Sequence, residues 1–279
     1  MVSSILLGDG PRGRSCWLSG FDATPRYAGG PDILRSDDAG RTWTALKTGT
    51  AEDVARVVSS RTHRLVFAGG ALWACTRHGL ARSTDAGESW ARVRGMSGTE
   101  AEETFDVTWW GSALWAATRE GMQFSEDGGG RWRRAGALRC PVRQSTVSGR
   151  HLWMGTMGGV ILRGRGGDLR SFSAKSSILA MTSTREYGAD TWWLGTTAGL
   201  HCTRDNGRTW RTYTVADGLP SNVIQTLASF EERVWAGTDG GVWVSADGVE
   251  SGRCYDRSHG LRGLDVRDIA FGEKRVWAA

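Results

Sequence analysis

Six polar residues stand in or beside short turns where their side chains could bind a polar or anionic ligand. Arginine pairs with carboxylates and phosphates through charge-assisted hydrogen bonds, and Glu, Asp, Asn and His supply complementary donors and acceptors. Because the turns come from different parts of the chain, a fold must bring them together before they can act as one site. We assign these residues to ligand binding and assign no catalytic residue: Arg77, His78, Arg119, Glu120, Asn222 and Asp239.

Five aspartates recur in a Ser/Thr-x-Asp pattern, and four of them continue as Asp-x-Gly-x-x-Trp. A carboxylate at this place can accept backbone N–H groups of its own turn, and the following glycine can adopt a positive φ. The tryptophan is expected to pack back over the hairpin. We therefore predict a structural role for these aspartates, which would lie at equivalent turns of different repeats: Asp38, Asp85, Asp127, Asp205 and Asp247.

The elements that carry these turns are repeats marked by a recurring tryptophan, which in most repeats follows an aliphatic residue. After the first interval, successive marker tryptophans are 38 to 42 residues apart. A period near 40 residues with four short strands per unit is typical of a β-propeller. The marker residues are Trp17, Trp73, Trp115, Trp153, Trp193, Trp235 and Trp277.

The pattern predicts an all-β fold, a β-propeller of four-stranded antiparallel blades that forms a single domain over residues 1–279. In the sixth repeat we expect strands at 223–227, 233–238 and 241–245. Seven blades are favoured, with the last one incomplete. A six-blade alternative has composite closure: the terminal strand pair joins strands near 33–46 and leaves residues 1–20 outside the ring. Closure matters because an open blade exposes unpaired backbone groups.

Residues 36–43, 83–90, 125–132 and 203–210 resemble the Asp-box (bacterial neuraminidase, BNR) repeat. Residues 217–242, with Asp-Gly-Leu-Pro and Trp-Ala-Gly-Thr-Asp-Gly-Gly-Val, resemble the sensor propellers of two-component regulators. The Asp-box resemblance implies a propeller of a group that includes sialidases, other glycan hydrolases, sorting receptors and photosystem-assembly factors. The Arg-Ile-Pro motif of sialidases is absent from the sequence.

Composition narrows the function classes. The chain has 40 Gly, 15 Trp and a net charge of +5, with its arginines scattered, which argues against a nucleic-acid partner. Its five cysteines form no CxxC pair and its histidines show no metal spacing, so we expect no metal and no cofactor. No apolar run reaches the length of a membrane span. The first residues do not form a signal peptide, which predicts a cytoplasmic protein if this N-terminus is native and an extracytoplasmic one if the chain is a fragment.

The function predicted from the sequence is a non-catalytic propeller, a binding scaffold or sensor part that recognises a protein or a small polar or glycan ligand on its channel face. The alternatives are a glycan-active hydrolase of the sialidase type and a photosystem-assembly-type factor. Two Trp-Trp pairs, 109–110 and 192–193, could add a partner surface. Because neighbouring strand residues point to opposite faces, one ring of each pair should be less buried.

Overall fold

The computed structural model describes most of the chain. The described residues are 2–10, 13–20, 33–46, 62–96, 103–136, 139–148, 151–157, 159–165, 168–173, 176–186, 189–205, 207–246, 251–272 and 276–279. Two compact units can be distinguished, residues 1–142 and 143–279, called unit 1 and unit 2 below. The insertion that the sequence places between Gly20 and Ile33 lies outside the described residues, as does Asp247.

Unit 1 contains three antiparallel sheets, each of four strands that pair in chain order. In each sheet the second strand carries a marker tryptophan. Sheet 1 is β1 (Val2–Gly10), β2 (Gly13–Gly20), β3 (Ile33–Ser36) and β4 (Thr44–Ala45); sheet 2 is β5 (Thr62–Ala68), β6 (Ala71–Thr76), β7 (Gly79–Ser83) and β8 (Ala91–Arg92); sheet 3 is β9 (Thr104–Trp110), β10 (Ala113–Thr118), β11 (Gly121–Ser125) and β12 (Arg133–Arg134).

Unit 2 continues the same plan with three more four-stranded sheets and one sheet of two strands, together with two short 3-10 helices. Sheet 4 is β13 (Val142–Ser148), β14 (His151–Thr156), β15 (Val160–Arg165) and β16 (Asp168–Ser173); sheet 5 is β17 (Ile178–Glu186), β18 (Ala189–Thr196), β19 (Gly199–Thr203) and β20 (Arg211–Tyr213); sheet 6 is β21 (Ile224–Phe230), β22 (Arg233–Thr238), β23 (Gly241–Ser245) and β24 (Gly252–Tyr255); sheet 7 is β25 (Ile269–Phe271) and β26 (Val276–Ala278); the helices are η2 (Val215–Asp217) and η3 (Arg257–His259).

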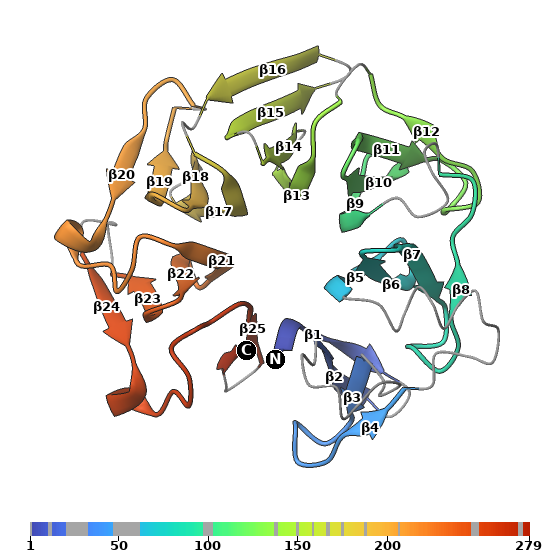
Figure 1. Cartoon of the computed structure of the whole chain (residues 1–279), viewed down its shortest axis with the longest axis horizontal. Helices are drawn as coiled ribbons and strands as arrows, with labels where there is room; N and C mark the ends of the chain where they lie inside the picture. The colour runs from blue at the N-terminus through green and yellow to red at the C-terminus, as the bar shows by residue number, and fades with distance from the viewer. Residues whose placement is uncertain are drawn as a thin grey trace. The chain divides into compact units, whose positions relative to one another are not determined.

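Within unit 1, consecutive sheets pack face to face through their first strands, so that β1, β5 and β9 lie side by side (Figure 1). The core between sheets 1 and 2 surrounds Trp17, which is fully buried with Leu65 and Leu72. The core between sheets 2 and 3 surrounds Trp73 in the same way. The marker tryptophans Trp17 and Trp73 therefore join one sheet to the next.

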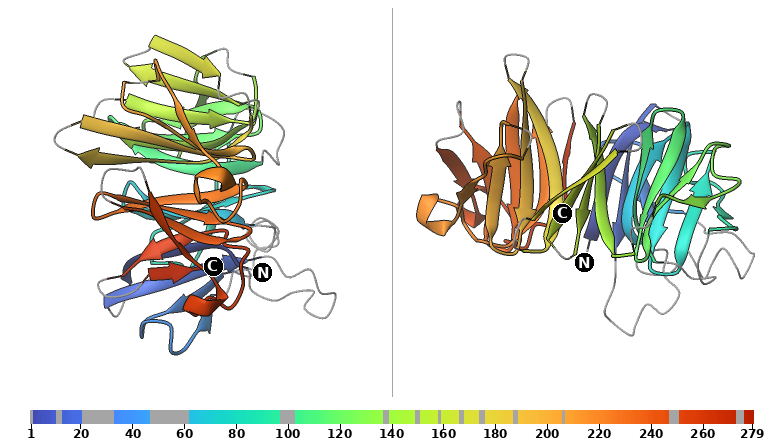
Figure 2. Two further views of the ribbon diagram at one scale, coloured as in Figure 1. Left: turned by 90° about the vertical axis from the view of Figure 1, so that its left-hand side faces the viewer. Right: turned by 90° about the horizontal axis from the view of Figure 1, so that it is seen from above.

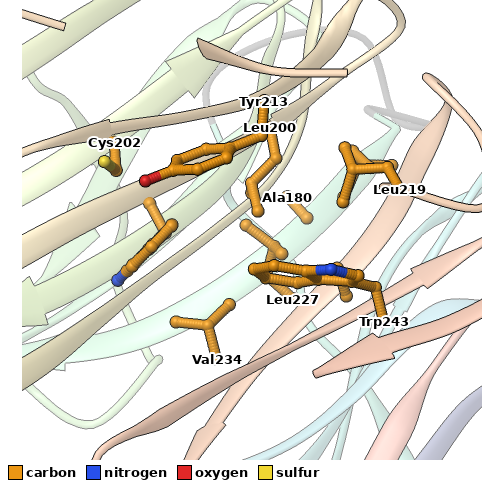
Figure 3. Packing of buried hydrophobic residues seen from close by; sticks show 11 residues of the cluster. Ala180, Leu200, Cys202, Tyr213, Leu219, Leu227, Val234 and Trp243 are labelled. Carbon is orange, nitrogen blue, oxygen red and sulfur yellow. The ribbon is translucent and has the colours of Figure 1, made fainter. Parts of the chain in front are cut away.

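Unit 2 repeats this packing through its first strands: β17 contacts β21, and β21 contacts β25. Figure 2 gives two further views of these strands. In the cluster between sheets 5 and 6, the Tyr213 ring centroid lies 6.3 Å from that of Trp193 and 6.3 Å from that of Trp243. Figure 3 shows Tyr213 and Trp243 in this cluster. Each large ring thus buries a wide apolar area between the two sheets.

The predicted antiparallel four-stranded units are confirmed, and in sheet 6 the second and third strands have the predicted bounds. The closure alternative is wrong in its treatment of residues 1–20 and 33–46. Cys16 pairs with Ser36 and Ser19 with Ile33, so β2 and β3 are neighbours in one complete sheet. The first repeat supplies all four of its strands, because β1 pairs antiparallel with β2 in the same sheet.

The prediction for the Trp-Trp pairs holds for one pair only. Trp109 is 44% exposed, whereas Trp192 is 1% and Trp193 0% exposed. Both faces of sheet 5 are covered by neighbouring sheets: Trp193 enters the cluster with sheet 6, and Trp192 packs on Trp153 of sheet 4. Opposite orientation therefore does not expose a ring when each face of the sheet has a neighbour.

Candidate functional site

The turns that carry most of the predicted ligand residues are built alike: each begins with a buried threonine of its own. Its hydroxyl donates to the carbonyl oxygen of the glycine three residues later and accepts the backbone N–H two residues later. The hydroxyl-to-carbonyl distance is 2.9 Å for Thr76–Gly79, 2.8 Å for Thr118–Gly121, 2.9 Å for Thr196–Gly199 and 2.9 Å for Thr238–Gly241. The two residues between threonine and glycine are thereby held at the tip of a rigid turn.

In unit 1 this turn geometry places Arg77 and His78 at one end of sheet 2. Arg77 is exposed, and His78 is half-buried with its backbone N–H bound to Thr76. The Nδ1 atom of His78 is buried and has no hydrogen-bond partner among the described residues. Arg77 has no ion pair within the same described ranges.

The equivalent turn of sheet 3 holds Arg119 and Glu120, and both have partners. Arg119 Nη1 lies 3.3 Å from Glu103 Oε2, and the other carboxylate oxygen of Glu103 lies 2.9 Å from His63 Nε2. Glu120 forms an ion pair with Arg134 of β12. Since a carboxylate can only accept, the Nε2 atom of His63 carries the proton in this contact.

His63 belongs to the same end of sheet 2 as Arg77 and His78, because its neighbour Thr62 pairs with Thr76. Glu103 directly precedes β9 and is 18% exposed, so it is a half-buried anion between a histidine and an arginine. We call the set Arg77, His78, Arg119, Glu120, His63 and Glu103 the turn site. It joins four predicted residues to two that sequence reasoning missed.

A signal for the two missed residues was present in the sequence. His63 and Glu103 are 40 residues apart, which is one repeat, so they occupy similar places at the start of neighbouring first strands. Further polar contacts join residues in or before the first strands of neighbouring sheets at similar separations. Gln225 Nε2 donates to Asp265 Oδ1 at 2.5 Å, and Arg64 Nε lies 3.6 Å from the buried Asp106.

The other two predicted residues belong to unit 2. Asn222 is engaged in its own loop, where its Oδ1 accepts the N–H of Val215 at 2.9 Å and its carbonyl accepts the N–H of Gly199 at 2.8 Å. Asp239 is exposed at the tip of the turn between β22 and β23. Asn222 therefore fixes the loop that precedes sheet 6, and Asp239 is the freer of the two side chains.

Each described aspartate of the Ser/Thr-x-Asp pattern is bound by its own turn. Asp205 Oδ1 accepts from Thr203 Oγ1 at 2.8 Å and from the N–H of Thr209 at 2.9 Å, while Oδ2 accepts from the Thr209 hydroxyl at 2.6 Å. The Thr209 hydrogen bonds lower the pKa of Asp205 to about 2. Asp38 has the same set of bonds from Ser36 and Thr42, and its pKa is also about 2.

The remaining two turns differ in detail. For Asp85, burial raises the pKa, but hydrogen bonds from Ser89 and Ser83 outweigh it and the pKa is lowered. Asp127 has an arginine at the position of the hydroxyl residue, so the N–H of Arg131 is its main donor, at 2.8 Å. The carboxylates are thus ionised and occupied within their turns.

These turns also contact the preceding sheet, which the sequence did not indicate. Trp17 Nε1 of sheet 1 donates to the carbonyl oxygen of Ala86 in sheet 2 at 3.1 Å. A Cβ atom on Gly87 would lie 2.6 Å from a methyl carbon of Leu46, and one on Gly129 would lie 2.5 Å from the Trp73 ring. The turn backbone therefore caps the marker tryptophan of the sheet before it.

In the described part of the chain, no group of three or more His, Cys, Asp or Glu side chains could hold a metal ion. No helix among the described residues has the length and apolar character needed to cross a bilayer. The five cysteines are free thiols.

Comparison with known proteins shows which solved structures have a similar fold. No family model matches the chain, and no curated protein matches it. Similar solved structures include YCF48 bound to a D1 peptide, with a TM-score of 0.69, 16% identity and coverage of 97% of this chain and 86% of the other. Virginiamycin B lyase from Staphylococcus aureus has a TM-score of 0.74, 15% identity and coverage of 100% and 91%.

A third similar structure is the extracellular domain of the putative hybrid two-component system BT4673 from B. thetaiotaomicron. Its TM-score is 0.73 at 14% identity, and the match covers all of this chain but 37% of that one. Together with the sheet topology, these likenesses define the class: the chain is an all-β β-propeller of four-stranded antiparallel sheets. At such identities the likeness extends to the fold alone, because unrelated functions share this architecture.

Proposed function

We propose that the chain is a non-catalytic, seven-bladed propeller domain, spanning residues 1–279, that binds a protein segment or small polar ligand at the turn site of unit 1. The observation that carries the proposal is the arrangement of Arg119, Glu103 and His63, in which one carboxylate from sheet 3 contacts both an arginine and a histidine of two neighbouring sheets. Arg77, which is exposed, lies at the same end of sheet 2 as His63.

The chemistry favours an anionic group on the ligand. Arginine has five N–H donors in a fixed fork, and Glu103 engages one nitrogen of Arg119, so donors remain for a carboxylate or phosphate. Glu103 already contacts Arg119 within the protein itself, which limits the side-chain entropy lost on binding. The threonine-held turns add rigidity to the same surface.

The solved relatives support a binding role. One of them is described as bound to a peptide, and others are extracellular domains of two-component systems. A peptide or a soluble polar molecule is therefore a reasonable ligand class. Under this proposal the aspartates of the Ser/Thr-x-Asp turns, Asp247 among them, support the blades and do not contact the ligand.

Binding of defined probes tests the proposal. We would titrate the chain with a glutamate-rich peptide, a lysine-rich peptide, inorganic phosphate and a xyloglucan oligosaccharide, using calorimetry. Loss of a hydrogen bond to a charged group costs about 1.5–3 kcal/mol, so Arg119→Gln and Arg77→Gln should each weaken binding of the glutamate-rich peptide by roughly 10- to 100-fold. Arg131→Gln is the matched control, since Arg131 is an exposed arginine in the Asp127 turn.

Two alternatives would give different results. A glycan-active hydrolase would release reducing sugar from the oligosaccharide, and that turnover would contradict the non-catalytic assignment. A photosystem-assembly-type factor would use arginines from neighbouring blades to bind a protein partner, and it would not bind inorganic phosphate. Equal affinity of all three variants for the glutamate-rich peptide would remove the turn site from consideration.

A further inference from the structure

The tip of the sheet 2 turn carries two side chains that can both donate hydrogen bonds. Arg77 is exposed and forms no ion pair in the described part of the chain, and His78 directly follows it. In the equivalent turns of sheets 3, 5 and 6, the place of His78 is taken by Glu120, Ala198 and Gly240. Among these four turns, only that of sheet 2 therefore carries two donors and no carboxylate.

The burial of one ring nitrogen decides which tautomer His78 adopts. Its Nδ1 atom is buried without a hydrogen-bond partner, whereas its Nε2 atom is neither buried in this way nor bonded within the described ranges, so Nε2 is open to solvent. A neutral imidazole has one N–H donor and one bare acceptor nitrogen. Because buried N–H groups without an acceptor are rarer than buried acceptors without a donor, the proton lies on Nε2. His78 thus offers a donor to the solvent.

The charges of the turn site leave one positive charge unbalanced among the described residues. Arg119 is paired with Glu103, and Glu120 is paired with Arg134. Arg77 has no such carboxylate. A phosphate monoester carries about −1.5 to −2 charges at pH 7, whereas an ionised carboxylate carries one. A carboxylate therefore matches the charge of Arg77, and a phosphate would add excess negative charge to a surface that already holds two glutamates.

We propose, on the basis of the binding role assigned to the turn site above, that its ligand group is a single carboxylate, which Arg77 binds through its guanidinium and His78 orients through Nε2–H. The arginine fork matches the two carboxylate oxygens, and the imidazole N–H adds a bond from a second direction. The Thr76 hydroxyl, 3.1 Å from the N–H of His78 and 2.9 Å from the carbonyl of Gly79, holds the turn in place beforehand. The carboxylate belongs to an acidic side chain or to the C-terminus of a peptide.

The tautomer can be measured in the whole chain without any ligand. Long-range nitrogen–proton NMR spectra at about pH 8, where an ordinary imidazole is neutral, show which ring nitrogen carries the proton. The signals of His78 are assigned by their loss in His78→Gln. We expect a protonated Nε2 and a bare Nδ1. A proton on Nδ1 would overturn the proposal even if an anionic peptide binds at the turn site.

Three short peptides with acetylated N-termini separate a carboxylate from a phosphate and identify the source of the carboxylate. The first has a single glutamate and an amidated C-terminus, the second has no acidic side chain and a free C-terminus, and the third has phosphoserine in place of the glutamate. Chemical-shift titration measures their affinities. At least one carboxylate peptide should bind more tightly than the phosphoserine peptide. Equal or tighter binding of the phosphoserine peptide, or no binding of either carboxylate peptide at millimolar concentration, contradicts the proposal.

Two substitutions at one position test the donor of His78. His78→Gln keeps an amide N–H near the place of Nε2, whereas His78→Asn moves it to the place of Nδ1. Because a hydrogen bond to a charged group is lost, His78→Asn should weaken binding of the tighter carboxylate peptide by roughly 10- to 100-fold, while His78→Gln stays within about threefold of the parent. His259→Asn, at an exposed histidine of unit 2, is the matched control and should bind as the parent does.

The variants distinguish failure of this proposal from failure of the turn site as a whole. If Arg77→Gln and Arg119→Gln weaken binding but His78→Asn does not, the turn site stands and the role of His78 is overturned. If none of the three alters binding, the turn site itself is excluded. If circular dichroism shows that His78→Asn disturbs the fold, the tautomer and the comparison with the phosphoserine peptide still decide the result.

Discussion

The indole nitrogen of Trp17 donates a hydrogen bond to the carbonyl oxygen of Ala86, 3.1 Å away, and this contact joins sheet 1 to the aspartate-containing turn of sheet 2. Arg35 of sheet 1 reaches the same turn, with its guanidinium 2.7 Å from the carboxylate of Glu88. A turn that is local in the sequence is therefore also a connector between neighbouring sheets, and its conformation should affect the packing of both.

The first prediction concerns Gly87 in that turn. Gly87→Ala places a Cβ 2.6 Å from Leu46 at a backbone φ of +93°. The left-handed conformation costs roughly 1–2 kcal/mol and overpacking about 1–3 kcal/mol, so the free energy of unfolding should fall by about 2–5 kcal/mol. Urea denaturation measures it. Gly70→Ala is the control: its φ is +74° with nothing within 4 Å of the added carbon, so the strain acts alone.

The second prediction concerns the buried threonine of the sheet 5 turn. Thr196→Val keeps the shape of the side chain but leaves the N–H of Ala198 and the carbonyl of Gly199 without their hydroxyl partner. An unsatisfied buried group costs about 1–3 kcal/mol, and we expect a loss of that size in the free energy of unfolding. Thr209→Val, which removes an exposed hydroxyl, serves as a comparison. If Thr209→Val lowered the free energy of unfolding more than Thr196→Val, the importance assigned to the Thr196 hydroxyl in its turn would be contradicted.

A third prediction follows from the lowered pKa of Asp38 and Asp205, each about 2. An unfolded aspartate titrates near 3.9, so the stability these carboxylates contribute is complete above that pH and is lost as the pH falls through about 2. Carbon NMR of the carboxyl groups should show both residues ionised at pH 3. Titration of Asp205 near 4 in the folded protein would show that the Thr209 hydrogen bonds are absent in solution.

The fourth prediction is that protonation of His201 makes the stability of the native state depend on pH, in a higher pH range than the aspartates do. Burial lowers its pKa below the ordinary 6.5, while its two ring nitrogens contact Thr196 and Thr212. The unfolded chain takes up the proton first as the pH falls below about 6.5, so His201 makes the native state less stable in that range. Denaturation at a series of pH values should show stability rising with pH there, and His201→Gln should flatten that part of the curve.

Some of the fold could be predicted from the sequence because the repeat fixes it. The bounds of β22 and β23 follow from a tryptophan, a threonine and a glycine at regular places. The burial of Trp192 could not be predicted in this way, since it depends on Trp153 from the neighbouring sheet. The contact between His63 and Glu103 was accessible in principle, because one repeat separates them, but the choice of partners along two strands requires the register.

The contacts between first strands have a consequence for folding kinetics. Most of them join residues about one repeat apart, such as His63 with Glu103 and Gln225 with Asp265. Loop-closure entropy therefore need not be overcome over long distances, and each sheet can dock as soon as the next one has formed. Within each unit we expect stepwise folding, sheet after sheet, at a rate set by closing loops of one repeat.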